Sequence, residues 1–230
     1  MDGLSAAALE ALRLIFSGDA EVYGMIGLSL EVSLTAVALA SLAGIPAGFA
    51  LALAPVPWRG LWVTVIHALM GTPPVVMGLM VFLLLSRQGP LGSWGLLFTP
   101  TAMVMVQTLL AWPIVTGLTY AAARGVHPLT IETARTLGAS PRQLVWVLAM
   151  ETRTGMLAAV VAGLGRALAE VGGVLMVGGN IAGQTRVMTT AIAMETAKGN
   201  HTLALALGMV LIGLGLGLNA LLYRLKGGAP

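Results

Sequence analysis

Charged and polar side chains are scarce in this chain, and one group of them lies between residues 124 and 153. Within it, Ile131, Ala134 and Leu137 recur at helical spacing. Gly138, followed by Ser140 and Pro141, favours a sharp turn into a second short helix. A short amphipathic helix whose charged end lies beside a turn is typical of a docking element. The alternative is an ordinary interfacial helix packed on lipid headgroups.

A second group of ionisable residues begins with Arg166 and Glu170, which are four residues apart within an apolar stretch. At this spacing the two side chains share one face of a helix. Ionisable groups at membrane depth are costly and normally face a bundle interior or an aqueous cavity. Two interpretations stay open: an internal ion pair that fixes helix packing, or a role in a translocation pathway.

The segment GGNIAGQTR, residues 178–186, follows this pair. Gly179 and Gly183 allow the backbone to bend and to present N–H groups at close range. Asn180 and Thr185 add neutral hydrogen-bond donors, and Arg186 adds a fixed positive charge. Such a set suits brief contact with an anion, because conduction requires binding that is also easily released. The alternative is a solvent-exposed turn outside the membrane.

Prolines interrupt two further apolar stretches. Thr72, Pro73 and Pro74 interrupt one stretch, and Trp112-Pro113 lies inside the next. Each proline removes a backbone hydrogen bond, so these positions could flex or gate a pore-lining helix. A static kink is the equally weighted alternative.

Catalysis and cofactor binding are not expected. The chain lacks a P-loop, a Ser/His/Asp arrangement and an H-E-x-x-H pattern. It has no cysteine, and its histidines (His67, His127, His201) are scattered, so we expect no metal site. Any ATP must therefore be hydrolysed by a separate subunit.

The composition indicates whether these residues lie in water or in a lipid bilayer. Of the 230 residues, 57% are hydrophobic and only 9% are charged, whereas a soluble domain is about a quarter charged. Apolar blocks of twenty or more residues match a bilayer core of roughly 30 Å. The net charge of +3 is explained by loop arginines, so no nucleic-acid partner is expected. The sequence predicts an all-α polytopic membrane protein in contact with lipid.

About five transmembrane helices are predicted, without an internal repeat. Their approximate ranges are Met25–Ala54, Val63–Leu85, Thr101–Ala123, Thr154–Val177 and Leu203–Leu222. Residues 1–24 form an N-terminal interfacial segment with a short amphipathic helix. Residues 25–225 form the membrane domain, which contains the loop of about 124–153.

The charges of the loops predict the orientation. If the 124–153 loop is cytoplasmic, the inner side carries more basic residues than the outer side, as the positive-inside rule requires. The N-terminus is then outside and the C-terminus is cytoplasmic in a plasma (inner) membrane. The inner basic residues are Arg59, Arg124, Arg135, Arg142, Arg153, Arg224 and Lys226.

Residues in the 124–153 loop resemble a known family. The pattern Glu-x-Ala-x-x-x-Gly, formed by Glu132, Ala134 and Gly138, is similar to the coupling loop of ABC importer permeases. This resemblance implies a type I ABC importer permease-like fold and a helix that seats in a cleft of a cytoplasmic ATPase. Where the family closes the loop with Leu-Pro, this chain has Met150-Glu151. The coupling residues implied are Glu132, Ala134, Arg135, Gly138, Ala139 and Ser140.

The second polar region resembles a narrower group, the permeases for tetrahedral oxyanions. Their Gly-Glu-Phe-Gly-like segment is matched at Glu170 and Gly172, and their Gly-Asn-Ile-Pro-Gly-x-Thr segment at residues 179–185, with Ala182 in place of the proline. Together with TPPVV, SRQGPLG and ETAKGN, the pattern is most similar to tungstate permeases. The pathway or gate residues implied are Thr72, Pro73, Pro74, Arg166, Glu170, Gly179, Asn180, Gly183, Thr185 and Arg186.

The resemblance implies an assembly. Two copies of the chain form the pore, an ABC ATPase subunit docks on residues 132–140, and an extracytoplasmic oxyanion-binding protein delivers the anion. Tungstate is the expected substrate, with molybdate or sulfate as alternatives. A gradient-driven secondary transporter would need acids along the pathway, for which only Glu31 and Glu170 qualify. A membrane-embedded enzyme would need nucleophiles or metal ligands that the sequence does not provide.

Overall fold

The chain folds into helices joined by short loops, as the sequence predicts. The computed structural model describes residues 2–225, with side chains from residue 9; Lys226, among the expected inner basic residues, lies outside this range. The described part contains no strand, which confirms the all-α fold class. The elements are α1 (Asp2–Phe16), α2 (Ala20–Leu53), α3 (Arg59–Met70), α4 (Pro74–Leu85), η1 (Gly92–Trp94), α5 (Pro100–Arg124), α6 (Pro128–Thr136), α7 (Pro141–Glu151), α8 (Arg153–Leu168), α9 (Gly172–Gly178), α10 (Met188–Ala197) and α11 (His201–Leu225).

Three helices are long and apolar enough to cross a membrane, namely α2, α5 and α11. The count rises to five if two bent helix pairs each count as one span: α3 with α4, bent by 97°, and α7 with α8, bent by 73°. The expected span Val63–Leu85 thus corresponds to two helices at nearly a right angle. The Thr72-Pro73-Pro74 segment forms the bend because Pro73 cannot donate a helical hydrogen bond.

The fourth expected span is also divided. We expected one helix over Thr154–Val177, but α8 ends at Leu168 and α9 starts at Gly172. At 16 residues, α8 is about 24 Å long. The polar Glu170 and the glycine pair that follows it lie at this break.

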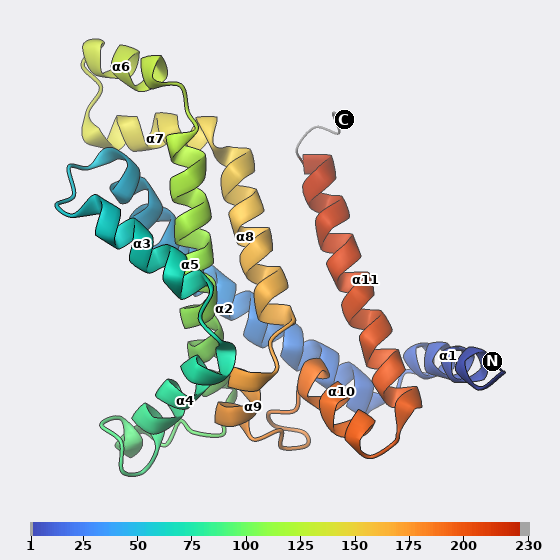
Figure 1. The fold of residues 1–230 in the computed structure, drawn as a ribbon. Coiled ribbons are helices and arrows are strands. Elements are labelled where there is room, and N and C mark those ends of the chain that lie inside the picture. Colours follow the sequence, from blue (N-terminus) through green and yellow to red (C-terminus); the bar gives the residue numbers. More distant parts are fainter. Residues whose placement is uncertain (1, 226–230) are drawn as a thin grey trace.

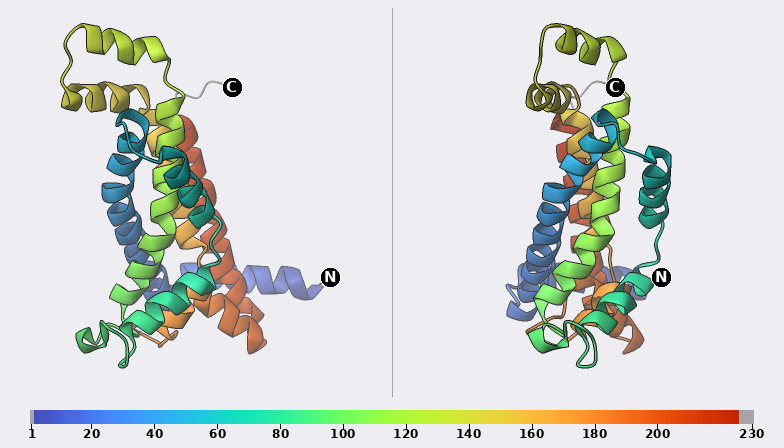
Figure 2. Two further views of the ribbon diagram at one scale, coloured as in Figure 1. Left: turned by 60° about the vertical axis from the view of Figure 1, so that its left-hand side comes forward. Right: turned by 90° about the vertical axis from the view of Figure 1, so that its left-hand side faces the viewer.

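The helices run alternately between two ends of the molecule (Figures 1 and 2). α6 and α7 lie at one end, where α11 also terminates. α1, α9 and α10 lie towards the other end, together with the start of α2 and the tip of the α4–α5 connection. We call these the hairpin end and the opposite end. α2 has 34 residues, or about 51 Å, and slants across the bundle; tilting is one way in which a helix longer than the hydrocarbon core is accommodated.

The core forms where α2, α5 and α8 pack closely. A Cβ added at Gly48 of α2 would lie 2.8 Å from the carbonyl oxygen of Thr116 in α5. At Gly44 it would lie 3.0 Å from the Thr116 hydroxyl. Small residues let helix backbones approach closely in membranes. These glycines therefore fix how α2 crosses α5.

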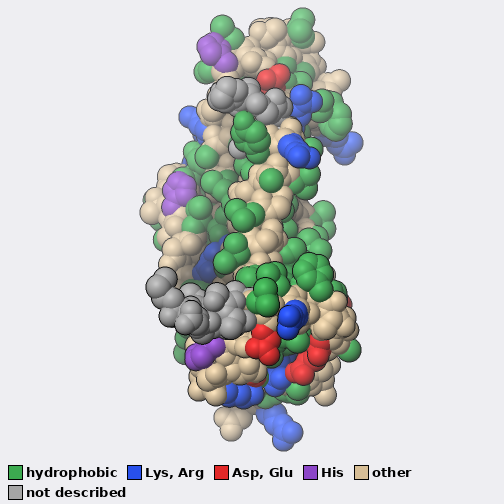
Figure 3. All heavy atoms as spheres, turned by 90° about the vertical axis from the view of Figure 1, so that its right-hand side faces the viewer, with side chains coloured by type: hydrophobic (Ala, Val, Ile, Leu, Met, Phe, Trp, Pro, Cys, Tyr) green, Lys and Arg blue, Asp and Glu red, His purple; other side chains and the backbone are tan. Residues whose placement is uncertain are grey.

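α11 stands partly apart from this core. Its first half packs on α10, α2 and α1 through Leu207, Met188 and Val22, but only 11% of its most apolar stretch is buried. An apolar groove of about 470 Å³ is lined by the second half of α11 and by α8. On this face, hydrophobic side chains and backbone occupy the middle, and charged side chains gather mainly towards the two ends (Figure 3).

Candidate docking and translocation sites

The α6–α7 hairpin is built by local capping. Gly138 adopts a φ of +81°, a left-handed conformation that glycine accepts without strain. Ser140 then caps α7: its N–H donates to Gln143 Oε1 at 2.7 Å, and its hydroxyl accepts from the Gln143 N–H at 3.4 Å. Glycine and the capping box reverse the chain between two short helices, as the sequence predicts.

The hairpin projects from the bundle (Figure 1), and several of its large apolar side chains are exposed. α6 has no buried residue. Leu137 is 82% exposed and Trp146 is 68% exposed, while Glu132 and Arg135 are exposed beside them. Exposed large apolar side chains next to charges are typical of an interaction surface. On the inner side of the hairpin, Ile131 of α6 packs on the cluster of Phe49 and Leu148, and α7 buries Leu144 and Leu148.

Glu170 is a buried structural anchor in this structure. Its side chain is 2% exposed; one oxygen accepts the Gly173 N–H at 2.8 Å, and the other pairs with Arg166 at 3.3 Å. Its carbonyl oxygen accepts the hydroxyl of Thr189, in α10, at 2.7 Å. Glu170 therefore ties the end of α8 to the starts of α9 and α10.

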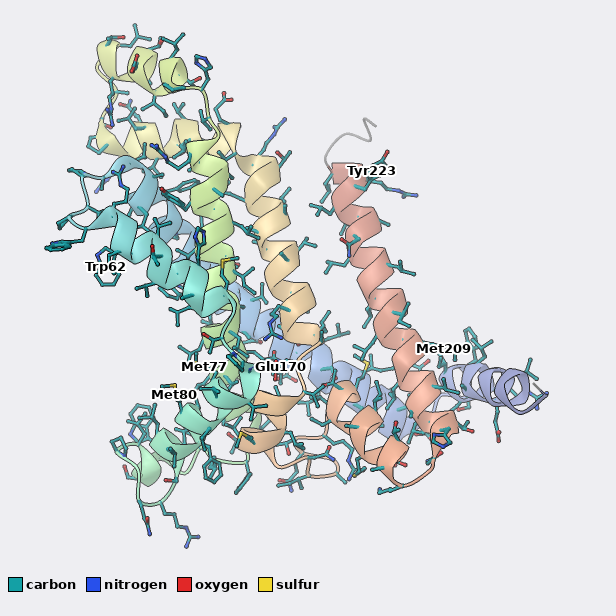
Figure 4. The ribbon with its side chains drawn as sticks, in the orientation of Figure 1. Trp62, Met77, Met80, Glu170, Met209 and Tyr223 are labelled. Carbon is teal, nitrogen blue, oxygen red and sulfur yellow. The ribbon has the colours of Figure 1, made fainter. Side chains whose placement is uncertain are left out.

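The start of α4, which follows Thr72-Pro73, packs against the glycine pair at the start of α9. A Cβ added at Gly78 of α4 would lie 2.5 Å from the Cα of Gly173 in α9, and one at Gly172 would lie 2.6 Å from Val75. The carbonyl of Pro74 lies against Gly173 in the same way. α4 and α9 thus pack backbone to backbone beside Glu170 (Figure 4). The bend after Thr72-Pro73 and the break at Glu170 form one junction.

The 178–186 segment folds into a compact loop. The hydroxyl of Thr185, which is fully buried, donates to the Gly178 carbonyl and accepts the Ile181 N–H at 3.0 Å. Gly179 has a φ of +71° and lies against the ring of Phe98. The Nδ2 of Asn180 contacts Met194 Sδ at 3.3 Å, while its Oδ1 is buried without a hydrogen-bond partner in the described structure.

Arg186 pairs with Glu21 in the first turn of α2, at 3.2 Å. The Arg186 side chain is 17% exposed and that of Glu21 is 64% exposed. The Arg186 Nε is buried without a partner in the described structure. Arg166 and Arg186 thus belong to two separate ion pairs, one at the α8–α9 break and one at the opposite end.

The predicted site residues therefore fall into two sets. The six docking residues lie together on the hairpin. The other set divides between the α4–α9 junction (Thr72, Pro73, Pro74, Arg166, Glu170) and the 178–186 loop (Gly179, Asn180, Gly183, Thr185, Arg186). Their roles in docking and translocation stay predictions. Among the described residues, no cluster of three or more metal-ligating side chains occurs.

Sequence reasoning missed Gln107, a polar residue at the same junction. Gln107, in α5, is 3% exposed; its Nε2 donates to the Ala167 carbonyl at 3.1 Å, and its Oε1 has no partner in the described structure. It thereby provides a further donor to a carbonyl in the last turn of α8, which also accepts the Glu170 N–H at 3.2 Å. A single amide in an otherwise apolar span was the available signal.

Sequence comparison identifies relatives of the whole chain. Residues 44–227 match the family model described as binding-protein-dependent transport system inner membrane component. The chain is 39% identical to the tungstate uptake system permease protein TupB of Peptoclostridium acidaminophilum, over 98% of this chain and 99% of that protein. It is 41% identical to a probable anion ABC transporter permease protein of Haloferax volcanii, over 88% and 89% of the two chains.

Structure comparison supports the same fold. A structure of the MetNI methionine ABC transporter in inward-facing conformations aligns with a TM-score of 0.70 at 17% identity, covering 87% of this chain and 92% of that one. At this identity the likeness concerns the arrangement of helices alone. It places the broken spans and the projecting hairpin within a known architecture.

Proposed function

The chain belongs to the family of inner membrane components of binding-protein-dependent transport systems, and we propose that it is the tungstate permease subunit of an ATP-driven importer. Its coarser class follows from the relatives: it is an ABC importer permease of the tungstate, molybdate and sulfate type, a transport subunit rather than an enzyme. Full-length similarity to a tungstate permease is the observation that favours tungstate.

The hairpin is the proposed docking site for the ATPase. Members of this family pair with an ATPase and with a binding protein. Leu137 and Trp146 are exposed apolar side chains on a projecting helix pair, and Glu132 adds a charge that can fix register. When the ATPase subunits close on ATP, the hairpins move with them and transmit that motion to α5 and α8, the helices on either side of the hairpin.

Two copies of the chain form the proposed pore. The α4–α9 junction and the 178–186 loop would line the outer part of the pathway, and a binding protein outside would deliver the anion. Glycine backbone N–H groups, Asn180 and Arg186 can contact a doubly charged oxyanion without holding it tightly. The proposed orientation places the hairpin end in the cytoplasm and the opposite end outside.

Co-purification tests the docking proposal. The chain is co-expressed with its ATPase and binding protein, and ATPase recovery and anion-stimulated ATP hydrolysis are measured for wild type and Glu132→Arg. We expect Glu132→Arg to lose most of both, because it reverses a charge on the proposed docking surface. Glu10→Arg on α1, at the opposite end, is the control and should leave both unchanged. Normal coupling in Glu132→Arg would contradict docking through this hairpin.

Substrate identity is tested on the same reconstituted complex. Tungstate, molybdate and sulfate are compared for uptake into vesicles at equal concentration, with the binding protein saturating. We expect tungstate to be transported in preference to the other two anions. Preference for molybdate or sulfate would assign the chain to one of the related permease groups.

The role of Arg186 is tested by measuring anion uptake with the Arg186→Gln variant. Unchanged uptake would remove Arg186 from the proposed pathway.

A further inference from the structure

Two hollows adjoin at the hairpin end. One is a polar pocket of about 370 Å³ between the ends of α2, α5 and α6, lined by Arg59, Arg124, Arg135 and Glu132. The other is an apolar groove of about 450 Å³ between α2 and α7, lined by Pro46, Phe49, Ala50, Leu144 and Val145 among others. Leu53 and Arg135 line both, so the pocket opens beside the groove.

The polar pocket carries an excess of positive charge. Arg59, Arg124 and Arg135 face it with one carboxylate, that of Glu132. Arg59 donates through Nη2 to the Ala54 carbonyl at the end of α2, but its Nε is buried without a partner in the described structure. Within residues 9–225 no carboxylate lies within ion-pair distance of these three arginines. The pocket therefore suits an anion that supplies several acceptor oxygens.

We propose that these two hollows bind one anionic phospholipid of the cytoplasmic leaflet, with its phosphate among the arginines and an acyl chain along the groove. Basic pockets at the cytoplasmic ends of membrane helices are suited to anionic headgroups. Guanidinium groups pair well with phosphate oxygens. A free oxyanion would need only the polar pocket, whereas the adjoining apolar groove matches an acyl chain. The inference rests on the proposed orientation, which puts the hairpin end inside.

The position of this site gives the lipid a role in coupling. It lies between the end of α2 and the hairpin, and Arg135 and Leu144 contribute to it from α6 and α7. A bound lipid fills space behind the hairpin, so it braces the hairpin against the bundle. Coupling between ATP hydrolysis and transport is then stronger in membranes that contain anionic lipid.

Native mass spectrometry of the assembled transporter tests the site. The complex of permease and ATPase is exchanged into detergent with phosphatidylglycerol or phosphatidylcholine, and retained lipid is counted. We expect wild type to retain phosphatidylglycerol selectively, and Arg59→Gln and Arg124→Gln each to weaken binding about fivefold, the effect of one arginine near an anionic surface. Arg142→Gln, an exposed arginine of α7 that lines neither hollow, is the matched control. Equal retention by all four proteins would overturn the proposal.

A second variant separates a lipid from a free anion. Ala50→Trp fills the apolar groove and leaves every charge in place, so it should reduce phosphatidylglycerol retention as Arg59→Gln does. Excess inorganic phosphate should not displace the lipid. Displacement by phosphate would show that the pocket takes a free oxyanion, and unchanged retention in Ala50→Trp would show that no acyl chain lies in the groove; either result would overturn the proposal. Because retention is measured on complexes that already contain the ATPase, this failure is distinct from failure of docking.

Discussion

At the scale of single residues, Glu170 shows how one buried carboxylate can hold a broken helix together. It receives the Gly173 N–H and the Arg166 guanidinium, and its carbonyl receives the Thr189 hydroxyl. A carboxylate at the start of a helix also compensates the free N–H groups there. Substitutions of Glu170 can separate a role in packing, which affects thermal stability, from a role in the pathway, which affects uptake.

Glu170→Ala should lower stability. The change leaves Gly173 and Arg166 without their partner, and hydrogen bonds to charged groups contribute about 1.5–3 kcal/mol each. We expect the thermal midpoint of the purified protein to fall accordingly, while Glu170→Gln, which keeps an acceptor for Gly173, falls less. Glu151→Gln, on the exposed end of α7, is the control. If Glu170→Gln melts like wild type but loses uptake, the carboxylate acts in the pathway as well.

Glu195 makes stability depend on pH at the turn between α10 and α11. A hydrogen bond from Lys198 at 2.9 Å, followed by one from Asn200 at 2.8 Å, lowers the pKa of Glu195 below its ordinary value of 4.5. The unfolded chain then binds a proton more readily, so this stabilisation is present above pH 4.5 and is lost as pH falls towards the lowered pKa.

Thermal melts at several pH values measure this effect. The midpoint of Glu195→Gln should lie below that of wild type at pH 6, and the difference should shrink as pH falls from 4.5 to 3.5. Glu31→Gln, an exposed acid of α2, serves as the comparison and should show no such convergence. A constant gap across the range would mean that the carboxylate charge does not matter at this turn.

At the scale of elements, the junction of α4 and α9 depends on the absence of side chains. Gly78→Ala would place a methyl group 2.5 Å from the Cα of Gly173, where backbone cannot give way easily. We expect a loss of about 1–3 kcal/mol from overpacking, seen as a lower thermal midpoint. Gly27→Ala in α2 has no atom within 4 Å of the new methyl and should be neutral or slightly stabilising. Equal midpoints would show that α4 does not rest on α9.

Much of the order of the helices could be predicted from hydropathy and from the residues that cap or end helices. The ranges around α2, α5 and α11 follow from long apolar runs, and the hairpin from Gly138 and the Ser140 cap. The division of the fourth span could not be predicted in this way, because Ala169 and Val171 are apolar enough to continue a helix. The local signals were Glu170 and the glycine pair Gly172-Gly173, which follows Val171. The 97° bend after Met70 was signalled by Pro73, but its angle depends on contact with α9, which is distant in sequence.

The site was predictable to a similar degree. The six hairpin residues lie together because all of them fall within residues 132–140, so their spacing along the chain was sufficient. The meeting of Pro74 with Gly173, and of Arg186 with Glu21, joins residues far apart in sequence. No local sequence pattern predicts these two long-range contacts. They could be identified only from the packed structure.

At the scale of the whole molecule, the two ends differ in charge. Six of the expected inner basic residues lie in the described part, on the loops and helix ends of the hairpin end. The opposite end carries Glu21 and Glu195 together with Arg186 and Lys198. This asymmetry favours a cytoplasmic hairpin end.

Single cysteines test this orientation, because the chain has none of its own. Ser93→Cys lies in η1 at the opposite end, and Gly125→Cys lies in the exposed loop after α5 at the hairpin end. An impermeant maleimide should label Ser93→Cys in intact cells and Gly125→Cys only in inverted vesicles. The reverse pattern would invert the topology and, with it, the proposed docking side.

The weak attachment of α11 has a consequence for how cells maintain this protein. Only 11% of its most apolar stretch is buried, and Gly208, Gly213, Gly215 and Gly217 have open space around them. A chain synthesised in excess over its companions would leave this helix loosely held, and such orphan subunits are substrates for membrane proteases. Matched synthesis of all components would then affect the abundance of the chain in addition to its intrinsic stability.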